Sequence, residues 1–437
     1  MRYLFNINKS LSVLQWFIFM IASAVALPIV IGSVFHLPQH EVASLMQRTF
    51  FVVGVSSLLQ ALLGHRFPIV DGPAGSWVSV FIMMAGMAAQ QGQDAREALQ
   101  LLQGGLLVAG VLLFILGLTG LFYKLLTLFT PLVTNTFLFI LSMQLSGVFL
   151  KGMLGLGGAG PVNYGSAVIA FLIFSFVTVL TIKGKGWMRN YAVLLGIIIG
   201  WSAHALVVSD RVPQSFMAGS SSWVIFPKIF AWGLPHLNPG MAVTAVLFTL
   251  ILVSNLIAAI SAAQQVVPGR ENSNRMIYNR SSMIGGLSHG LTALFSAIGV
   301  VPLPVTTSFI RMTGQTQRKP FLLACLVLTA ISLMPGIVNF LSLLPTSIAS
   351  AISLATFVQM TGNSFRSLSR VTESQRDLTI LGIGLVIGVG FTLVASSSSQ
   401  GLPVAMQYVL GNGLLFATLL VMVLEQLWRS KPCSAVA

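Results

Sequence analysis

The chain is dominated by apolar runs that each approach the roughly 20 residues an α-helix needs to cross a bilayer. Fourteen such runs can be distinguished, at about 11–32, 43–63, 68–90, 101–121, 130–150, 166–182, 190–208, 239–262, 281–299, 301–315, 321–344, 346–364, 376–395 and 404–428. Only 7% of the residues are charged, whereas a soluble domain has about 25%. The sequence therefore predicts an all-α polytopic membrane protein with 14 transmembrane segments.

The basic residues test this count, because cytoplasmic loops carry most of the Lys and Arg of a membrane protein. With the N-terminus inside, 17 of the 23 Lys and Arg residues fall on the inner side. Five fall outside and one lies near or within the tenth segment; they are Arg48, Arg96, Lys151, Arg211 and Lys228, and then Arg311. The net charge of +14 is thus explained by orientation in lipid rather than by a nucleic-acid partner, and both termini are expected in the cytoplasm.

Two segments, the third and the tenth, are interrupted at matching places in the two halves of the chain. The third contains PIVDGPAGS at 68–76, and the tenth opens with PLP at 302–304. Pro and Gly disrupt regular helix, and such backbone persists at membrane depth only where protein or water surrounds it. Seven segments per half make the second half inverted, so the sequence predicts a 7+7 inverted repeat with a transport site at the two breaks. The helices that follow, from near Ser76 and over Thr306–Thr313, would direct their N-terminal ends at this site.

Five stretches resemble, in chain order, the first, fifth, seventh, eighth and twelfth segments of one family. They are LQWFIFM at 14–20, FTPLVTNTFLFILSMQL at 129–145, RNYAVLLGIIIGW at 189–201, LPHLNPG at 234–240 and LLPTSIASAISLATF at 343–357. The family is the nucleobase–ascorbate transporters (nucleobase:cation symporter-2), which include the bacterial uracil and purine permeases. The acid-Gly-Pro at Asp71 is similar to the third segment of one purine permease branch.

The resemblance implies a fold in which segments 3 and 10 begin as short extended strands that cross near the midplane. It implies a core domain from residues 1–125 (segments 1–4) and 239–344 (segments 8–11). The gate domain would comprise 126–238 (segments 5–7 and an outer loop) and 345–437 (segments 12–14 and a cytoplasmic tail). It also implies a transporter of the bacterial cytoplasmic (inner) membrane, surrounded by lipid and able to form a homodimer through the gate domains.

The function implied is import of a nucleobase by alternating access, with H⁺ or, less often, Na⁺ as the coupling ion. No other cofactor and no metal site is expected. The substrate would be a purine such as xanthine, hypoxanthine, guanine, adenine or urate, or else uracil; the sequence does not discriminate among them.

Several positions depart from the family pattern. The glutamate usual in the eighth segment is replaced by Asn255, and the acid expected at the start of the tenth falls at Val305. The usual histidine of the first segment is replaced by Trp16, beside a Gln15 that matches the family. Asp71 is an additional acid on the opposing break, and whether it replaces the missing acids is left open.

These positions define the predicted site. The predicted substrate-binding residues are Asp71, Gly72, Asn255, Thr306, Thr307 and Gln15, and the predicted proton-coupling residues are Asp71 and His289. Asp71 is the one acid of nine placed within a segment, where an ionisable group by default suggests function; the alternative is a helix cap at a wet edge. Asn255 could instead hold helices together, His289 could be hydrogen-bonded within the bundle, and Trp16 is expected to pack. Arg311 could pair with Asp71 or extend to the inner interface.

Other classes of protein fit less well. The sequence has no His-Glu-x-x-His motif, no paired cysteine ligands and no Gly-x-Ser-x-Gly elbow, so no enzyme is predicted. The main alternative is an anion carrier, of sulfate or carboxylate type, with the same inverted-repeat architecture. A channel would show symmetric pore elements, and it ranks below both.

Overall fold

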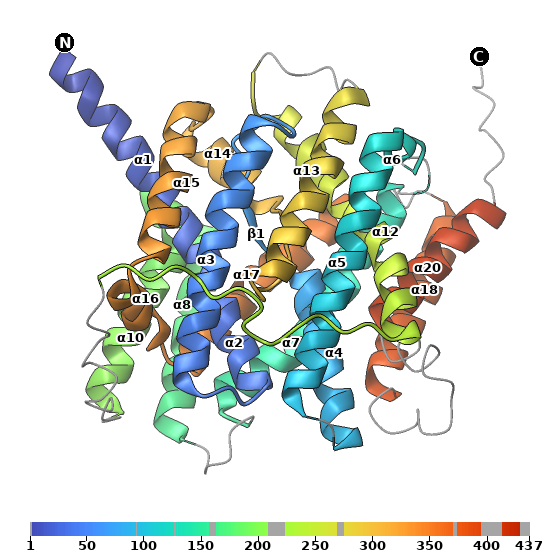
Figure 1. Ribbon diagram of the computed structural model, residues 1–437, viewed down its shortest axis with the longest axis horizontal. Coiled ribbons are helices and arrows are strands. Elements are labelled where there is room, and N and C mark those ends of the chain that lie inside the picture. The colour runs from blue at the N-terminus through green and yellow to red at the C-terminus, as the bar shows by residue number, and fades with distance from the viewer. Residues whose placement is uncertain are drawn as a thin grey trace.

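The computed structural model describes residues 2–92, 94–125, 128, 130–156, 163–208, 223–268, 275–369, 374–394 and 413–428. In this part of the chain it is a bundle of helices around two short strands, with β1 in the middle of the bundle (Figure 1). The first half contains α1 (Arg2–Ala24), α2 (Ala26–Val34), α3 (Gln39–Leu62), β1 (Asp71–Pro73), α4 (Gly75–Gln91), α5 (Ala95–Thr119), α6 (Leu121–Leu125), α7 (Pro131–Leu154), α8 (Tyr164–Lys183), α9 (Trp187–Asn190) and α10 (Ala192–Val207).

The second half contains α12 (Pro239–Gln264), α13 (Arg275–Leu294), β2 (Val300–Pro302), α14 (Val305–Thr313), α15 (Arg318–Ser332), α16 (Pro335–Ser342), α17 (Thr346–Leu368), α18 (Gln375–Val394) and α20 (Gly413–Leu427). The predicted helix starts near Ser76 and at Thr306 are confirmed within one residue. The first part of the fourteenth predicted segment, before Gly413, lies outside the described residues.

Helix length and hydropathy support a membrane protein. In the described ranges six helices are long and apolar enough to span a membrane, or seven if α15 and α16 count as one bent span. Shorter apolar helices occur at Gly75–Ala89, Ala192–Val207 and Gly413–Leu427. The total of 14 segments and their 7+7 repeat stay predictions.

The eleventh predicted segment differs from the expectation of one helix over 321–344. It is divided into α15 and α16, whose axes are bent by 88°. Pro335 opens α16, and a proline lacks the N–H that would continue α15 and clashes with the preceding turn. The break therefore follows directly from the sequence at Met334-Pro335.

Polar residues followed by proline start two of the longest helices. Thr130 accepts a hydrogen bond from the N–H of Val133 at 3.3 Å, and Asn238 accepts one from Met241 at 2.7 Å. In both cases the next residue is a proline, whose missing N–H needs no partner in the first turn. Local chemistry thus fixes where α7 and α12 begin.

The two strands form an antiparallel pair that confirms the expected extended starts of segments 3 and 10. The register pairs Asp71 with Pro302, Gly72 with Val301 and Pro73 with Val300. The backbone pairing continues at both ends. Leu303 N–H donates to the Val70 carbonyl at 2.9 Å, and Ala74 N–H donates to the Gly299 carbonyl at 2.8 Å. Extended backbone inside the bundle is thereby satisfied, as an apolar environment requires.

Glycines let helices from the two halves approach each other closely. A Cβ added to Gly286 of α13 would lie 2.5 Å from the Gly110 carbonyl oxygen and 2.7 Å from the Phe114 nitrogen of α5. Ser282 then reaches across to donate to the Leu113 carbonyl at 2.6 Å. Small residues at such contacts are the usual means by which helices pack in lipid.

We expect Gly286→Ala to destabilise the protein, because the added methyl group meets backbone atoms that cannot move aside. Overpacking of this kind typically costs about 1–3 kcal/mol. Gly290→Ala, one turn further along α13, is the matched control, since its Cβ would meet nothing within 4 Å. The melting temperature of the detergent-solubilised protein should fall for Gly286→Ala only; equal melting temperatures would contradict this packing account.

Candidate functional site

α4 and α14 begin directly after the crossing strands, one at each end of the antiparallel pair. The first N–H groups of a helix have no partner within that helix, and α4 has no side-chain cap at Ala74. The N–H of Ala74 is used by Gly299, which leaves those of Gly75, Ser76 and Trp77 directed outward from the helix start. Together with the helix dipole, these groups favour an electron-rich partner.

A polar pair lies at the same place. Asn255 of α12 donates through its Nδ2 to the hydroxyl of Ser76 at 3.4 Å, with 8% and 2% of these residues exposed. An amide group can both donate and accept hydrogen bonds. The structure thus brings the predicted Asn255 to the start of α4 and adds Ser76, which sequence reasoning did not select.

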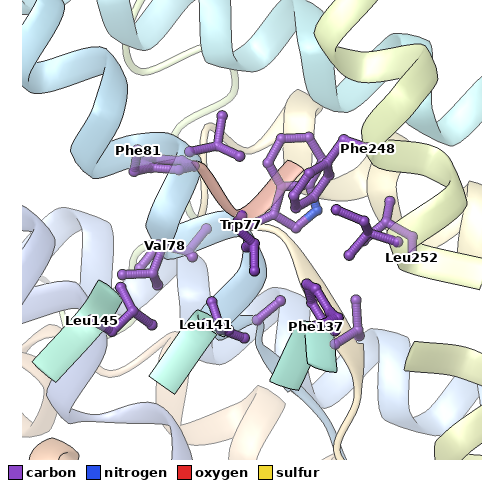
Figure 2. Packing of buried hydrophobic residues seen from close by; sticks show 14 of the residues in the cluster. Trp77, Val78, Phe81, Phe137, Leu141, Leu145, Phe248 and Leu252 are labelled. Carbon is purple, nitrogen blue, oxygen red and sulfur yellow. The ribbon is translucent and has the colours of Figure 1, made fainter. Parts of the chain in front are cut away.

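Apolar side chains enclose this pair. Trp77 is fully buried, and its ring centroid lies 4.6 Å from that of Phe248 on α12. Figure 2 shows Trp77 and Val78 between α12, which contributes Phe248 and Leu252, and α7, which contributes Phe137, Leu141 and Leu145. Nothing in the sequence distinguishes a tryptophan that encloses a polar pair from one that only packs in an apolar segment.

His289 of α13 is hydrogen-bonded to Trp77. The indole N–H of Trp77 donates to His289 Nε2 at 3.0 Å. His289 Nδ1 lies 2.8 Å from the Gly285 carbonyl oxygen, so this nitrogen carries the proton that it donates. Both ring nitrogens of a neutral imidazole are therefore engaged, which is the hydrogen-bonded alternative considered for His289.

Asp71 is 1% exposed, which places this acid inside the bundle. Its backbone N–H donates to the hydroxyl of Ser57 at 2.9 Å. Neither carboxyl oxygen has a hydrogen-bond partner among the described residues. Cys325 of α15 is within electrostatic reach of the carboxyl group, and β1 packs on α1 and α3. The carboxyl group therefore lies in the apolar interior formed by these helices.

Asp71 and Asn255 have different described neighbours. The backbone of Asp71 is hydrogen-bonded to Ser57 of α3, whereas the side-chain amide of Asn255 is hydrogen-bonded to Ser76 of α4. No described contact joins these two predicted site residues, and the crossing adjoins both α3 and α12.

The other predicted residues of the breaks hold the crossing together. Thr306 accepts a hydrogen bond from the Val70 N–H at 3.3 Å, and the Thr307 hydroxyl donates to the Pro304 carbonyl at 2.7 Å. A Cβ on Gly72 would lie 2.5 Å from the Leu303 Cδ1, so the absence of a side chain at Gly72 makes room for the leucine of the other break. Both threonine hydroxyls are thus used in backbone contacts.

The predicted residues of the first segment lie elsewhere. Gln15 accepts a hydrogen bond from Gln315 at 3.0 Å and also contacts the Tyr191 side chain. Trp16 is fully buried, with ring centroids 4.8 Å from Phe309 and 4.9 Å from Phe321. Its expected packing role is confirmed, and the contacts described for Gln15 do not join it to Asn255.

Arg311 and Arg48 differ in a way that the sequence did not reveal. Arg311 is exposed in the last turn of α14 and makes no ion pair with the buried Asp71. Arg48, assigned above to the outer side, is 2% exposed within α3. Its guanidinium donates to the backbone carbonyls of Phe295 and Ser296, and counting charges by side does not reveal such burial.

Two contacts join the segments predicted as core to those predicted as gate beside this site. A Cβ on Gly75 would lie 2.8 Å from Phe357 Cζ of α17 and 3.5 Å from Leu145 of α7. The hydroxyls of Thr134 on α7 and Ser254 on α12 are 3.1 Å apart. Ser254 adjoins Asn255, so the polar pair lies at the boundary between the two groups of segments.

Two interrupted segments that pair through short strands inside a bundle of apolar helices are typical of membrane transport proteins. The comparisons with known proteins agree. The model of the xanthine/uracil permeases, described as "Permease family", matches residues 8–397, and the chain belongs to this family.

The chain is 31% identical to YwdJ of Bacillus subtilis, named as a candidate purine permease, with 96% of each chain covered. It is 26% identical to the uric acid transporter UacT of Escherichia coli, over 94% of this chain and 84% of UacT. The transmembrane domain of the cyanobacterial bicarbonate transporter BicA has the same fold, with a TM-score of 0.61 at 14% identity and 95% and 97% coverage. Murine Slc26a9, an anion transporter solved facing inward, gives 0.62 at 12% identity and 97% and 68% coverage.

We expect His289→Phe to destabilise the protein, because the buried indole N–H of Trp77 loses its acceptor. Leaving such a donor unsatisfied costs about 1–3 kcal/mol. In a Trp77→Phe background the same substitution should cost less, because the donor is already absent. Melting temperatures of the two single variants and the double variant measure this coupling; strictly additive shifts would show that the pair does not interact.

Proposed function

We propose that this protein imports a purine nucleobase by secondary active transport with alternating access. The observation that carries the proposal is the family membership over residues 8–397, combined with an amide–hydroxyl pair at a helix start. Relatives that cover nearly the whole chain are named for purine and uric acid transport. The proposal includes a location in the bacterial inner membrane, both termini in the cytoplasm, and a homodimer formed through the gate segments.

The chemistry of the pair suits the edge of a purine, which alternates donors and acceptors. The Asn255 amide supplies both, and the Ser76 hydroxyl and the first N–H groups of α4 add further donors and an acceptor. Trp77 and Phe248 pack beside the pair with ring centroids 4.6 Å apart and ring planes tilted by 54°, giving an aromatic, apolar boundary. No carboxylate adjoins Asn255 in the described contacts, so recognition rests on neutral groups and the helix dipole.

Coupling to protons is assigned to Asp71. An ionised carboxylate without a partner is very unfavourable in an apolar interior, and the carboxyl oxygens of Asp71 have none in the described residues. The neutral acid is compatible with the packed arrangement around β1, whereas the charged form would need water or a cation beside it. Proton loss at Asp71 would therefore change how β1 packs, and β1 leads directly into the start of α4.

His289 takes a different role in this proposal. Both of its nitrogens are engaged, so it orients Trp77 rather than carries the transported proton. Sodium remains the alternative ion for the Asp71 position, and replacing protons by sodium in the transport assay distinguishes the two.

The anion-carrier alternative is supported by the fold alone, because BicA and Slc26a9 are anion transporters. The first helix turn of α4 could face an inorganic anion as well as a base. The amide–hydroxyl pair and the sequence relatives favour the nucleobase.

We expect saturable uptake of a radiolabelled purine in cells that lack their own permeases, faster at acidic than at neutral external pH. Asp71→Asn keeps the neutral form permanently, so its uptake should no longer depend on pH. Glu97→Gln, at an exposed acid on α5, is the control and should keep the normal pH dependence. If uptake by Asp71→Asn still depended on pH, the coupling role of Asp71 would be wrong. Uptake of bicarbonate or sulfate, but of no base, would establish the anion carrier.

We also expect Asn255→Ala to raise KM for the transported purine more than Asn255→Gln, because glutamine keeps an amide that can reach the base. Removing a hydrogen bond of this kind costs about 0.5–1.5 kcal/mol, or roughly 2–10-fold in KM. Initial rates measured over a substrate range give KM and the maximal rate separately. Equal KM values for the two variants would indicate that Asn255 only packs.

A further inference from the structure

Both crossing strands follow a helix, α13 before β2 and α3 before β1. The last carbonyl groups of a helix have no N–H partner within it, and they carry the negative end of the helix dipole. Carbonyls that are buried need donors from the protein. An arginine donates at the end of each of these two helices, and each arginine comes from the other half of the chain.

The end of α13, just before β2, is capped by Arg48 of α3. Arg48 NH1 donates to the Ser296 carbonyl at 2.5 Å and to the Phe295 carbonyl at 3.3 Å. Its Nε donates to Ser44 of its own helix at 3.0 Å, which holds the side chain in place. With 2% of Arg48 exposed, the guanidinium is committed to these carbonyls.

Other groups complete the cap on α13. Gln103 of α5 donates to the Ala293 carbonyl and to the Ser296 hydroxyl, both at 2.7 Å. The Leu294 carbonyl accepts from the Phe230 N–H at 2.8 Å, and the Arg48 guanidinium lies 5.2 Å from the ring centroid of Trp232. Figure 1 shows the segment that contains Phe230 and Trp232 crossing in front of α3 and α5. Every carbonyl from residue 293 to 296 is thus satisfied.

The end of α3, just before β1, is capped by Arg318 of α15, whose NH2 donates to the Ala61 carbonyl. Arg48 and Ala61 are 13 positions apart on α3, which corresponds to roughly 20 Å along the helix axis. The two caps therefore lie toward opposite ends of the crossing. The half that contains β1 caps the helix before β2, and the half that contains β2 caps the helix before β1.

Each capped helix leads into its strand through a turn with the same unusual conformation. Ser296 has φ +48° and Arg66 has φ +62°, a left-handed region that residues other than glycine seldom adopt. The Ala297 N–H donates to the Thr292 carbonyl at 2.9 Å, and the Arg66 N–H donates to the Gln60 carbonyl at 3.2 Å. Such turns set the direction in which the chain enters the strand; Arg48 holds a carbonyl of the turn itself, and Arg318 holds one in the last turn of the helix before it.

We propose that Arg48 and Arg318 are positioning residues that fix the two crossing strands reciprocally, each from the opposite half of the chain. Neither contacts the amide–hydroxyl pair at Asn255; each acts through the turn before a strand. A guanidinium suits this role because it stays charged and presents several donors in a rigid plane. The effect of the two arginines on the position of the strands does not depend on which substrate is transported. Only their effect on uptake rests on the proposed function.

Hydrogen–deuterium exchange of the purified full chain, without substrate, tests the positioning directly. Arg48→Gln should increase exchange in a peptide covering 297–304, and Arg318→Gln should do so in one covering 67–74. The expected increase in the exchange rate is roughly tenfold or more, because a hydrogen bond to a charged group is lost. Arg48→Lys should restore part of the protection, because it keeps the charge and a donor.

Arg96→Gln and Lys319→Gln are matched controls, because these exposed basic residues lie on α5 and directly beside Arg318. Neither should change exchange at the strands. Unchanged strand exchange in Arg48→Gln and Arg318→Gln would overturn the proposal. Faster exchange throughout the protein, without preference for the strands, would also overturn it and leave the arginines a general structural role.

Uptake of radiolabelled urate supplies the functional readout. We expect Arg48→Gln to raise KM several-fold at an equal amount of protein in the membrane, with partial recovery in Arg48→Lys. If exchange at the strands changed but the KM for urate did not, the role of the caps in transport would be wrong, and their role in positioning the strands would remain. Absence of urate uptake in the unsubstituted protein concerns the proposed function alone, since the exchange experiment uses no substrate.

Discussion

The backbone pairing of β1 with β2 is the interaction on which the rest of the structure depends. Two stretches of extended chain lie inside an apolar bundle, where unpaired N–H and C=O groups are very unfavourable. Pairing each stretch with the other removes that cost and forces the two to meet. Because α4 and α14 begin directly after the strands, the antiparallel pairing also fixes where both helices start, one at each end of the pair.

The crossing also sorts the polar side chains. Asn255 and Ser76 lie where α4 meets α12, beside gate-assigned segments that reach Gly75 and Ser254. Asp71 lies on the side of α3 and α15. In the proposed mechanism the base and the proton therefore occupy separate places, and the strand that carries Asp71 connects them to the same helix start.

Much of the fold could be predicted from local composition. The apolar runs, the Pro–Gly breaks and the helix starts after Thr130-Pro131 and Asn238-Pro239 all follow from the chemistry of neighbouring residues. The contacts of the candidate site could not be predicted in the same way. Asn255 is hydrogen-bonded at the start of α4, His289 accepts from Trp77, the described contacts of Gln15 lie elsewhere, and the burial of Arg48 was not evident from its sequence neighbours.

The sequence by itself determined that this chain lies in a membrane, where its helices are interrupted and to which family it belongs. These properties depend on the free energy of each residue or short run of residues in lipid, and that free energy follows from the residue types within a short stretch of sequence. Only the tertiary structure decided that Arg48 caps α13, that Arg318 caps α3, and that Asp71 and Asn255 have hydrogen-bond partners on different helices. Such partners are up to about 250 residues apart, so their pairing depends on how helices pack and on which side of a strand each side chain falls.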